Sequence, residues 1–363
     1  MKNTFGNQVS ITLFGESHGE MLGAVIDGLP GGIEIDHDFI KSQLSLRRPA
    51  GDISTPRKET DEYSIVSGVF RGFTTGTPLC ILIPNSNTKS ADYGEALEIP
   101  RPSHADYAAH IKYNGFENFQ GGGHFSGRIT AAIVAAGAII ISALKNKGIL
   151  IGTHIARCGG IDDANFSDLN KDIDTLSRKI FATLDDKKGE EMMAKIREAK
   201  ETGDSVGGIL ETAVTGLPAG IGEPWFDSLE GVLSHAIFSI PGVKGVEFGL
   251  GFKISDMYGS EVNDPFFAEN GVIGIKTNNS GGINGGISNG NPIVFRTALR
   301  PTPTISRPQE SVNLKDNTNA VLESKGRHDP CIVHRARVVA DSITAITLLD
   351  MLSQKYGTDW IVE

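Results

Sequence analysis

One apolar segment, ITAAIVAAGAIIISA at residues 129–143, constrains the fold of this 363-residue chain more than any other. It is rich in alanine and shorter than the roughly 20 apolar residues that a helix needs to cross a bilayer. A helix that is apolar all around is stable where neighbouring elements cover it. We therefore expect residues 129–143 to form a buried core helix and not a membrane span.

Two further helical segments follow from the residue pattern. Residues 337–357 carry apolar side chains at helical spacing and end in Lys-Tyr-Gly, which predicts a second core-facing helix. The apolar positions of that segment are Val339, Ile343, Ile346, Leu349 and Leu352. Residues 164–203 are highly charged, and their thin apolar stripe predicts a surface helix with one narrow buried face. That stripe consists of Met192, Met193 and Ile196.

A short motif occurs twice, as GLPGGI at 28–33 and as GLPAGI at 216–221. Each copy follows a β-like run and precedes a predicted helix, for which Asp36 and Asp227 are the expected N-caps. The repeated order of strand, Gly-Pro turn and helix indicates an internal duplication, with a site between two similar halves. A chance repeat of a common turn is the alternative.

The composition is that of a globular protein with a negative net charge. The formal charge of −10 argues against nonspecific nucleic-acid binding, which needs a basic surface. A polyanionic ligand would require arginines concentrated in one pocket. The three separated cysteines (Cys80, Cys158, Cys331) and the lack of a secretory pattern in residues 1–22 predict a reducing, cytoplasmic location without disulfides.

The segment GESHG at 15–19 matches the G-x-S-x-G pattern of serine hydrolases. A nucleophile elbow needs a strand before the serine and a helix after it, whereas Gly19 is followed by glycines, β-branched residues and a proline. We therefore predict a β-hairpin over residues 8–28 with GESHG at its tip. A serine esterase that uses Ser17 is the disfavoured alternative.

A triple glycine in GGGHFSGR, residues 121–128, opens directly onto the apolar core helix. Backbone N–H groups and the helix dipole at such a start form an anion site, where Ser126 and Arg128 are placed to grip a phosphate. Arginines also stand beside prolines in three further loops, at 47–49, 300–304 and 327–330. Because arginine makes bidentate contacts with carboxylate and phosphate, these rigid loops predict an anion pocket.

Four histidines, His18, His104, His110 and His124, do not predict a metal site. The sequence has no HExxH motif or equivalent close pair, and no carboxylate completes a ligand set around them. We expect no bound metal.

Seven motifs occur in order along the chain: GESHG, RRP (47–49), SHADY (103–107), GGGHFSGR, SGGINGGISNG (280–290), RPTPT (300–304) and GRHDPC (326–331). Together they resemble the chorismate synthase family over the full chain, residues 1–363. The resemblance implies an α+β fold, a single-domain β-α-β sandwich with core helices between the sheets, assembled as a homotetramer. It also implies a lyase of the shikimate pathway. This enzyme uses reduced FMN to eliminate phosphate from 5-enolpyruvylshikimate 3-phosphate, with anti-1,4 geometry, and so forms chorismate.

By the same resemblance, His18 matches the family histidine that acts near the flavin, and His104 matches the one that protonates the leaving phosphate. Asp329 resembles the acidic residue that assists proton removal through flavin N5, and Ser17 and Ser126 resemble supporting serines. Flavin contacts carry over to Arg47, His124, Phe125, Ser126, Gly285, Arg300, Pro301, Thr302, Pro303, Thr304 and Arg327. Substrate contacts carry over to Arg47, Arg48, Arg128 and Arg327.

The chain departs from the family pattern at two places. The family usually has Arg, Ser and Glu where this chain has His124, Phe125 and Ile129, so a permanent charge is lost and a ring is gained beside the flavin site. A flavin-binding protein without elimination activity is the alternative that this departure raises. Asp52 and Ile53 stand where the family has a basic residue, which weakens any NADPH contact. We expect dependence on externally reduced FMN, with NADPH used only if flavin reduction is intrinsic, and no nucleic-acid or membrane partner.

Overall fold

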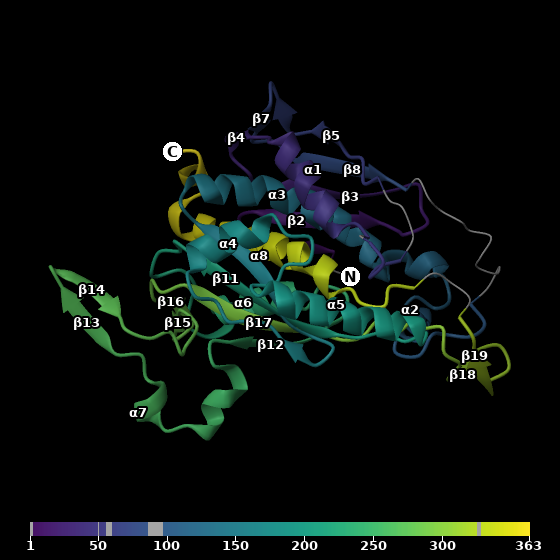
Figure 1. Cartoon of the computed structure of the whole chain (residues 1–363). Helices are drawn as coiled ribbons and strands as arrows, with labels where there is room; N and C mark the ends of the chain where they lie inside the picture. The colour runs from purple at the N-terminus through teal and green to yellow at the C-terminus, as the bar shows by residue number, and fades with distance from the viewer. Residues whose placement is uncertain (1–2, 50, 56–59, 86–96, 325–327) are drawn as a thin grey trace.

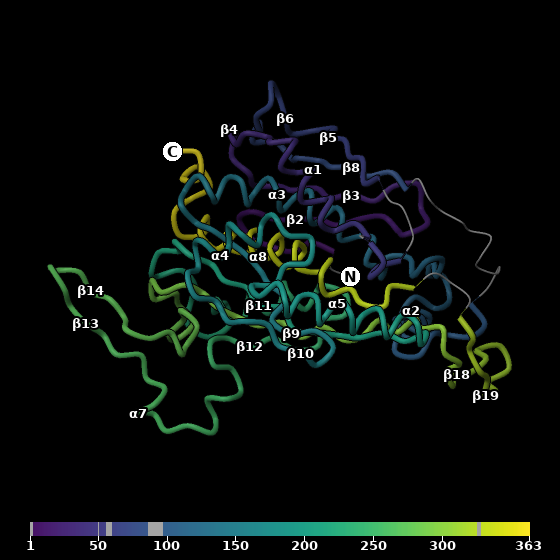
Figure 2. Tube along the Cα trace, in the orientation of Figure 1, coloured from purple at the N-terminus to yellow at the C-terminus, as the bar shows by residue number. Residues whose placement is uncertain are grey.

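The computed structural model describes residues 3–49, 51–55, 60–85, 97–324 and 328–363. Two five-stranded antiparallel sheets form the outer layers, and helices fill the layer between them (Figure 1). Figure 2 follows the same path as a Cα trace, with the N-terminal sheet at the top and the second sheet below. The predicted α+β arrangement of a β-α-β sandwich is confirmed.

Each sheet is drawn from one half of the chain. The first has the order β1 (Thr4–Phe5), β2 (Ser10–Gly15), β3 (Met21–Asp27), β8 (Leu79–Pro84) and β5 (Ser64–Ser67). The second has the order β10 (Ile161–Asp162), β9 (Leu150–Cys158), β11 (Gly208–Thr215), β17 (Ile293–Leu299) and β12 (Val243–Phe248). Strands β8 and β17 alternate strictly between buried and partly exposed residues over most of their length, so one face of each sheet meets the helices.

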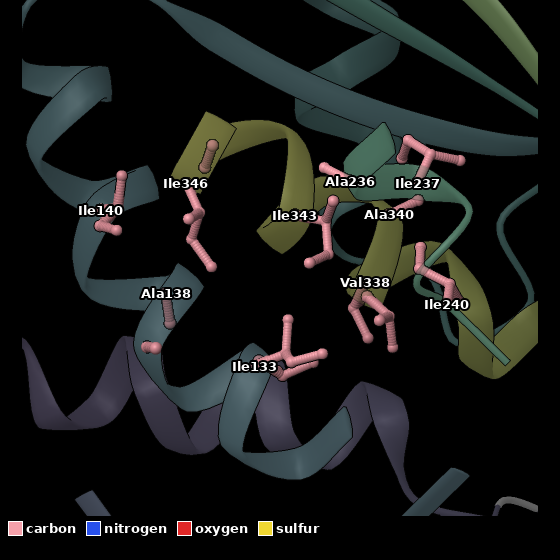
Figure 3. Close-up of a cluster of buried hydrophobic side chains, with 14 of the residues drawn as sticks. Ile133, Ala138, Ile140, Ala236, Ile237, Ile240, Val338, Ala340, Ile343 and Ile346 are labelled. Atoms are coloured by element: carbon pink, nitrogen blue, oxygen red, sulfur yellow. The ribbon is translucent and has the colours of Figure 1, made fainter. Parts of the chain in front are cut away.

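Four helices form the inner layer: α1 (His37–Arg47), α3 (Thr130–Asn146), α6 (Leu229–Ile237) and α8 (Val333–Tyr356). Helix α3 contacts β3 and β8, α8 contacts β9 and β11, and the two helices pack on each other. Their close approach depends on the missing side chain of Gly137, since a Cβ added there would lie only 2.3 Å from Cβ of Ser342. Figure 3 shows the apolar side chains of α3, α6 and α8 gathered in one cluster.

The segment that the sequence predicts as a core helix is indeed buried. The helical stretch Gly127–Asn146, taken with the turn that precedes α3, is long and apolar enough to cross a membrane, but 83% of its most apolar window lies inside the protein. The second predicted core helix is α8, in which nearly every residue up to Ser353 is buried. Both predictions are confirmed.

The remaining helices and strands lie outside the two large sheets and the inner helix layer. The further helices are α2 (Asp106–Lys112), α4 (Leu169–Ser177), α5 (Asp186–Glu201) and α7 (Gly259–Val262). A small sheet contains β4 (Gly31–Glu34), β7 (Phe73–Thr75) and β6 (Val69–Phe70). Three hairpins pair β13 (Phe266–Glu269) with β14 (Val272–Ile275), β15 (Ile283–Asn284) with β16 (Ile287–Ser288), and β18 (Gln309–Asn313) with β19 (Thr318–Leu322).

The topology supports the predicted duplication. The main elements follow the chain order β2, β3, α1, β5, β8, α3 in the first half and β9, β11, α6, β12, β17, α8 in the second. The corresponding strands also have the same neighbours in their sheets, because β2-β3-β8-β5 in the first matches β9-β11-β17-β12 in the second. Helices α3 and α8 are therefore equivalent elements of two similar halves.

The repeated GLP turn has the same backbone geometry in both halves. Gly28 has φ +85° and Gly216 has φ +77°, a region that residues with a side chain rarely adopt. An added Cβ would lie 1.9 Å from the carbonyl oxygen of Gln8 at Gly28, and 2.1 Å from that of Gly148 at Gly216. Each glycine thus lets its strand end against the start of the neighbouring strand, which explains why the motif recurs.

Three local predictions need correction. Asp36 caps α1 as expected, but the N-cap of α6 is Ser228 and not Asp227, because the Ser228 hydroxyl accepts the backbone N–H of Gly231. The charged region 164–203 forms two helices, α4 and α5, where one was predicted. The triple glycine does not open directly onto α3, since two 3₁₀ turns, Gln120–Phe125 and Gly127–Ile129, come first.

Candidate active site

The N-terminal ends of the equivalent helices α3 and α8 lie at the same end of the sandwich. Arg47, the last residue of α1, touches both, because its Nη1 donates to the carbonyl of Gly127 at 3.5 Å and its own carbonyl accepts from Arg335 Nε at 2.7 Å. At the opposite end, Lys147 after α3 lies over the ring of Trp360, which follows α8. Two positive helix-dipole ends therefore converge where the sequence motifs gather.

The β2–β3 hairpin places GESHG at its tip, as predicted, and this tip is docked on the glycine loop. The backbone N–H of Ser17 donates to the carbonyl of Gly123 at 3.0 Å, and His124 Nδ1 donates to the carbonyl of Gly15 at 2.7 Å. Asn85 Nδ2 holds the tip from the other side, through the carbonyls of Glu16 and Gly19 at 2.9 and 2.8 Å. The two motifs form one rigid unit.

The loop contains glycines because His18 and His104 lie close against its backbone. Gly121, Gly122 and Gly123 all have positive φ. A Cβ added at Gly121 would lie 2.0 Å from Cε1 and Nδ1 of His18, and one added at Gly122 would lie 3.4 Å from Cε1 of His104. The loop therefore runs between His18 and His104 with no room for a side chain at Gly121.

The esterase alternative is not supported by the structure. Ser17 sits on a hairpin between two strands and not at a strand-to-helix elbow. Its side chain is fully buried, and its Oγ makes no hydrogen bond within the described part of the chain. A nucleophile would need a base within hydrogen-bond reach. Ser17 instead has a buried hydroxyl without a hydrogen-bond partner among the described residues.

His104 is held by a buried carboxylate. Its Nδ1 lies 2.6 Å from Asp106 Oδ1, and Arg101 binds Asp106 through Nε and Nη2, both at 2.7 Å. Burial would raise the pKa of Asp106, but the hydrogen bonds and charges of Arg101 and His104 outweigh burial and hold that pKa well below its ordinary value. Ser103, just before His104, has φ +59°, so the chain is strained where it presents the ring.

Two of the arginines predicted to bind substrate form a buried cluster with one carboxylate. Asp61 binds Arg47 Nη2 at 2.9 Å and also binds Arg128 Nη1, and all three side chains are almost completely buried. Burial would raise the pKa of Asp61, but the charges of the two arginines outweigh it and keep the pKa low. Arg128 Nε also donates to Asn85 Oδ1 at 3.1 Å, which ties this cluster to the GESHG hairpin.

Asp329 is also engaged by the protein. Its carboxylate accepts the backbone N–H of Thr55 at 2.8 Å and pairs with Arg335 in the first turn of α8. Its carbonyl accepts from the hydroxyl of Thr302 at 2.6 Å, so the RPTPT loop rests on this segment. Arg300 Nη1 donates to the carbonyl of Ser103 at 2.6 Å, which joins the same loop to the His104 segment.

The structure brings most of the predicted residues to this end of the sandwich. Around the two helix starts lie Ser17, His18, Arg47, Arg48, His104, His124, Phe125, Ser126, Arg128, Arg300, Pro301, Thr302, Pro303, Thr304 and Asp329. Ser126 caps the 3₁₀ turn before α3 by accepting from the backbone of Arg128. Arg327 lies outside the described residues.

Gly285 is the exception among the described residues. It lies in the β15–β16 hairpin, whose Ser288 pairs with Gly220, and Gly220 in turn accepts from Lys355 in the last turn of α8. Helix α8 has 24 residues and is about 36 Å long, so Gly285 is far from Asp329 at its other end. Within one chain, Gly285 does not join the site.

Arg48 and Arg300 carry no carboxylate partner among the described residues, whereas Asp61, Asp106 and Asp329 are each paired with arginine. Nε of Arg48 is buried and makes no hydrogen bond there either. Together with two helix N-termini, these charges fit a ligand that carries several negative groups. No cluster of three His, Cys, Asp or Glu within the described ranges could hold a metal ion.

Sequence reasoning missed Asp61, Asn85, Arg101, Asp106 and Arg335, which hold the predicted residues in place. Asp106 is in the SHADY motif, so a signal for it existed. His328 was also missed. Burial, with the nearby charge of Arg101, lowers its pKa, and its Nε2 makes no hydrogen bond in the described structure. Asp61 had no local signal.

Comparisons with known proteins agree with this picture. The profile of a family described as chorismate synthase matches residues 9–353. Chorismate synthase from Thermococcus gammatolerans is 42% identical over 362 residues, covering 98% of this chain and 99% of its own. The proteins of that name from Dehalococcoides mccartyi and Parabacteroides distasonis are each 46% identical, with at least 96% of each chain covered.

A solved structure, described as the crystal structure of chorismate synthase, has the same fold. It matches with a TM-score of 0.77 at 30% sequence identity and covers 98% of this chain and 94% of its own. The match over nearly the whole length agrees with the order of the seven motifs. The chain therefore belongs to the chorismate synthase family of lyases.

Proposed function

We propose that this chain uses reduced FMN to eliminate phosphate from 5-enolpyruvylshikimate 3-phosphate and so forms chorismate. The observation that carries the proposal is the pairing of a carboxylate-held imidazole, His104, with anion-binding groups at two helix starts. The substrate has two carboxylates and a phosphate, which suits that charge arrangement. Loss of phosphate also needs a proton donor beside the leaving oxygen.

The chain's own residues have distinct parts in this proposal. His104 donates a proton from Nε2 to the leaving phosphate. The guanidiniums of Arg48 and Arg300, which have no carboxylate partner among the described residues, hold the substrate's anionic groups. Because these charges are fixed before the reaction begins, they stabilise the developing charge without reorganisation. Arg47, Arg128 and the helix N-termini add to the positive potential around the leaving group.

The residues present also fit a flavin. Reduced FMN, when bound, would supply an electron-rich ring to the elimination, with no net redox change. The buried Ser17 Oγ, which lacks a hydrogen-bond partner among the described residues, offers a polar contact to such a ligand. His18, next to Gly121, is assigned to hold or move a proton at the flavin side. His124, Phe125, Ser126 and the 300–304 loop are assigned to hold the cofactor, as is Arg327.

We also propose a cytoplasmic homotetramer without nucleic-acid or membrane partners. Large apolar side chains are exposed on Trp225, Phe226, Phe252, Tyr258, Phe266 and Ile273. Most of them belong to an arm made of the 3₁₀ turn Gly251–Asp256, α7 and the β13–β14 hairpin, which stands away from the sandwich in Figure 1. A patch of this kind favours burial against another subunit. Sedimentation equilibrium measures the number of subunits, and a monomer would contradict this part of the proposal.

The reaction is tested by anaerobic incubation with 5-enolpyruvylshikimate 3-phosphate, using dithionite-reduced FMN in one tube and NADPH with oxidised FMN in another. We expect chorismate in the first tube only, because Asp52 and Ile53 stand where the family has a basic residue. Chorismate in both tubes would show that the protein reduces its own flavin with NADPH. A protein that binds FMN and gives chorismate in neither tube is the inactive alternative, and the proposal fails.

Gly121→Ala is expected to lower turnover on the order of 100-fold, the scale of losing a positioned acid–base group, because the new Cβ must displace His18. Gly127→Ala is the matched control in the same loop. Gly127 has no heavy atom within 4 Å of an added Cβ, and its φ is not positive. Steady-state kinetics of both variants check the prediction. Equal loss in the two variants would mean that the loop, and not the space beside His18, is what matters.

A further inference from the structure

The carboxylate of Asp106 accepts four hydrogen bonds, and its side chain is only 3% exposed. Arg101 supplies three of them, from its backbone N–H at 3.0 Å and from Nε and Nη2 at 2.7 Å each. The fourth comes from His104 Nδ1, which lies 2.6 Å from Oδ1. This carboxylate is therefore fixed by Arg101 and faces a single histidine.

These contacts decide which ring nitrogen of His104 carries the proton when the ring is neutral. Nδ1 has two neighbours, Asp106 Oδ1 at 2.6 Å and Arg101 Nη2 at 3.1 Å. An ionised carboxylate can only accept, whereas a guanidinium can only donate. Arg101 Nη2 already donates to Asp106 Oδ1. The shorter, charge-assisted contact with the carboxylate therefore keeps a proton on Nδ1.

The other nitrogen, Nε2, is left for a ligand. It makes no hydrogen bond with any described residue, and it lies 3.5 Å from the position of a Cβ added at Gly122. The ring edge thus faces the glycine loop at the point where Gly122 has no side chain. With its proton on Nδ1, the neutral ring keeps a lone pair on Nε2, which is the state left after Nε2–H has given its proton away.

Two other histidines also pair with carboxylates but differ from His104 in burial or in the bonding of the second ring nitrogen. His154 is buried between Asp163 and Glu211, and both of its ring nitrogens are bonded, so it has no free edge. His110 pairs with Glu117 at 3.0 Å, but its side chain is 37% exposed. Among the histidines that pair with a carboxylate in the described structure, His104 alone combines a ring that is only 16% exposed with an unbonded nitrogen.

We propose that Asp106 is a positioning residue for His104. It holds the Nδ1–H tautomer and aims Nε2 at the substrate side of the glycine loop, and Arg101 fixes Asp106 for that task. The same logic operates where a buried aspartate orients a catalytic histidine and loss of its charge leaves the wrong tautomer. The inference rests on the proposed function for its kinetic consequence, but the tautomer itself can be measured without turnover.

The test compares Asp106→Asn with a matched control, Glu117→Gln, whose carboxylate pairs with His110 of α2. For Asp106→Asn we expect kcat to fall on the order of 100-fold or more, with KM little changed, because the amide can donate to Nδ1 and move the neutral proton to Nε2. For Glu117→Gln we expect wild-type kcat. In wild-type protein, ¹⁵N NMR of the neutral His104 ring, assigned by loss of its signals in His104→Gln, should show the proton on Nδ1.

Three results would overturn the proposal: wild-type His104 with its neutral proton on Nε2, a folded Asp106→Asn protein with wild-type kcat, or equal losses in Asp106→Asn and Glu117→Gln. If Asp106→Asn does not fold by circular dichroism, the tautomer of the wild-type ring decides. If wild-type protein makes no chorismate, the proposed function fails, while the NMR measurement still decides whether Asp106 sets the tautomer.

Discussion

His104→Ala is expected to lower kcat on the order of 100-fold or more and to leave the fold intact, and His18→Ala is expected to do the same. The two rings lie on either side of the glycine loop, which has no room for a side chain at Gly121. Neither side chain lies in the hydrophobic core, so its loss removes a proton-transfer group and little packing. The measurement is steady-state chorismate formation with reduced FMN, together with circular dichroism of each variant.

His110→Ala is the control for this prediction. Like His104, His110 contacts a carboxylate through Nδ1, and it lies only six residues further along the chain. It makes no contact with the glycine loop that holds the two site histidines, and its side chain is more exposed. We expect wild-type kcat for His110→Ala. Full activity in His104→Ala would remove that residue from the mechanism, and a similar loss in His110→Ala would point to a general effect on α2.

Local patterns in the sequence predicted the parts of the fold that local patterns control. The hairpin over 8–28, the helix capped by Asp36 and the apolar core helix are each set by residues a few positions apart. The repeated GLP turn also gave the duplication, because its glycines need positive φ in both halves. These predictions did not depend on knowing which segments meet in space.

What the sequence did not predict depends on contacts between distant segments. Asp61 pairs with Arg47 and Arg128, which are 14 and 67 positions away, so no spacing rule connects them. Gly285 belongs to a motif that resembles a flavin contact, yet the chain carries it to the far end of α8. The motif predicts the chemistry of a residue, and the fold decides which other residues it meets.

Asp61→Asn is expected to lower the free energy of unfolding by about 3–5 kcal/mol, the scale of breaking a buried ion pair. The substitution removes the carboxylate that binds the guanidiniums of both Arg47 and Arg128, while both arginines remain buried. Asparagine is the right replacement because Asp61 has φ +49°, which asparagine tolerates better than alanine. Urea unfolding followed by far-UV circular dichroism measures the loss.

A control variant tests whether the loss of stability comes from burial of the Asp61 ion pairs and not from loss of an ion pair as such. Asp52 pairs with Arg197 at 2.7 Å, close to the 2.9 Å between Asp61 and Arg47, but both Asp52 and Arg197 are exposed. Asp52→Asn should therefore leave the urea midpoint unchanged, because water and salt screen that pair. A loss in both variants, or in neither, would contradict the argument.

The pH dependence supplies an independent check with a fixed sign. The pKa of Asp61 is lower in the folded protein than its ordinary value of 3.8. Its ionised form therefore stabilises the fold fully above pH 3.8, and this stabilisation is lost as the pH falls from there through the folded pKa. The difference in unfolding free energy between wild type and Asp61→Asn should stay constant near neutrality and shrink only in acid. A difference that changed near pH 7 would assign the effect to another group, because no ionisation of Asp61 occurs there.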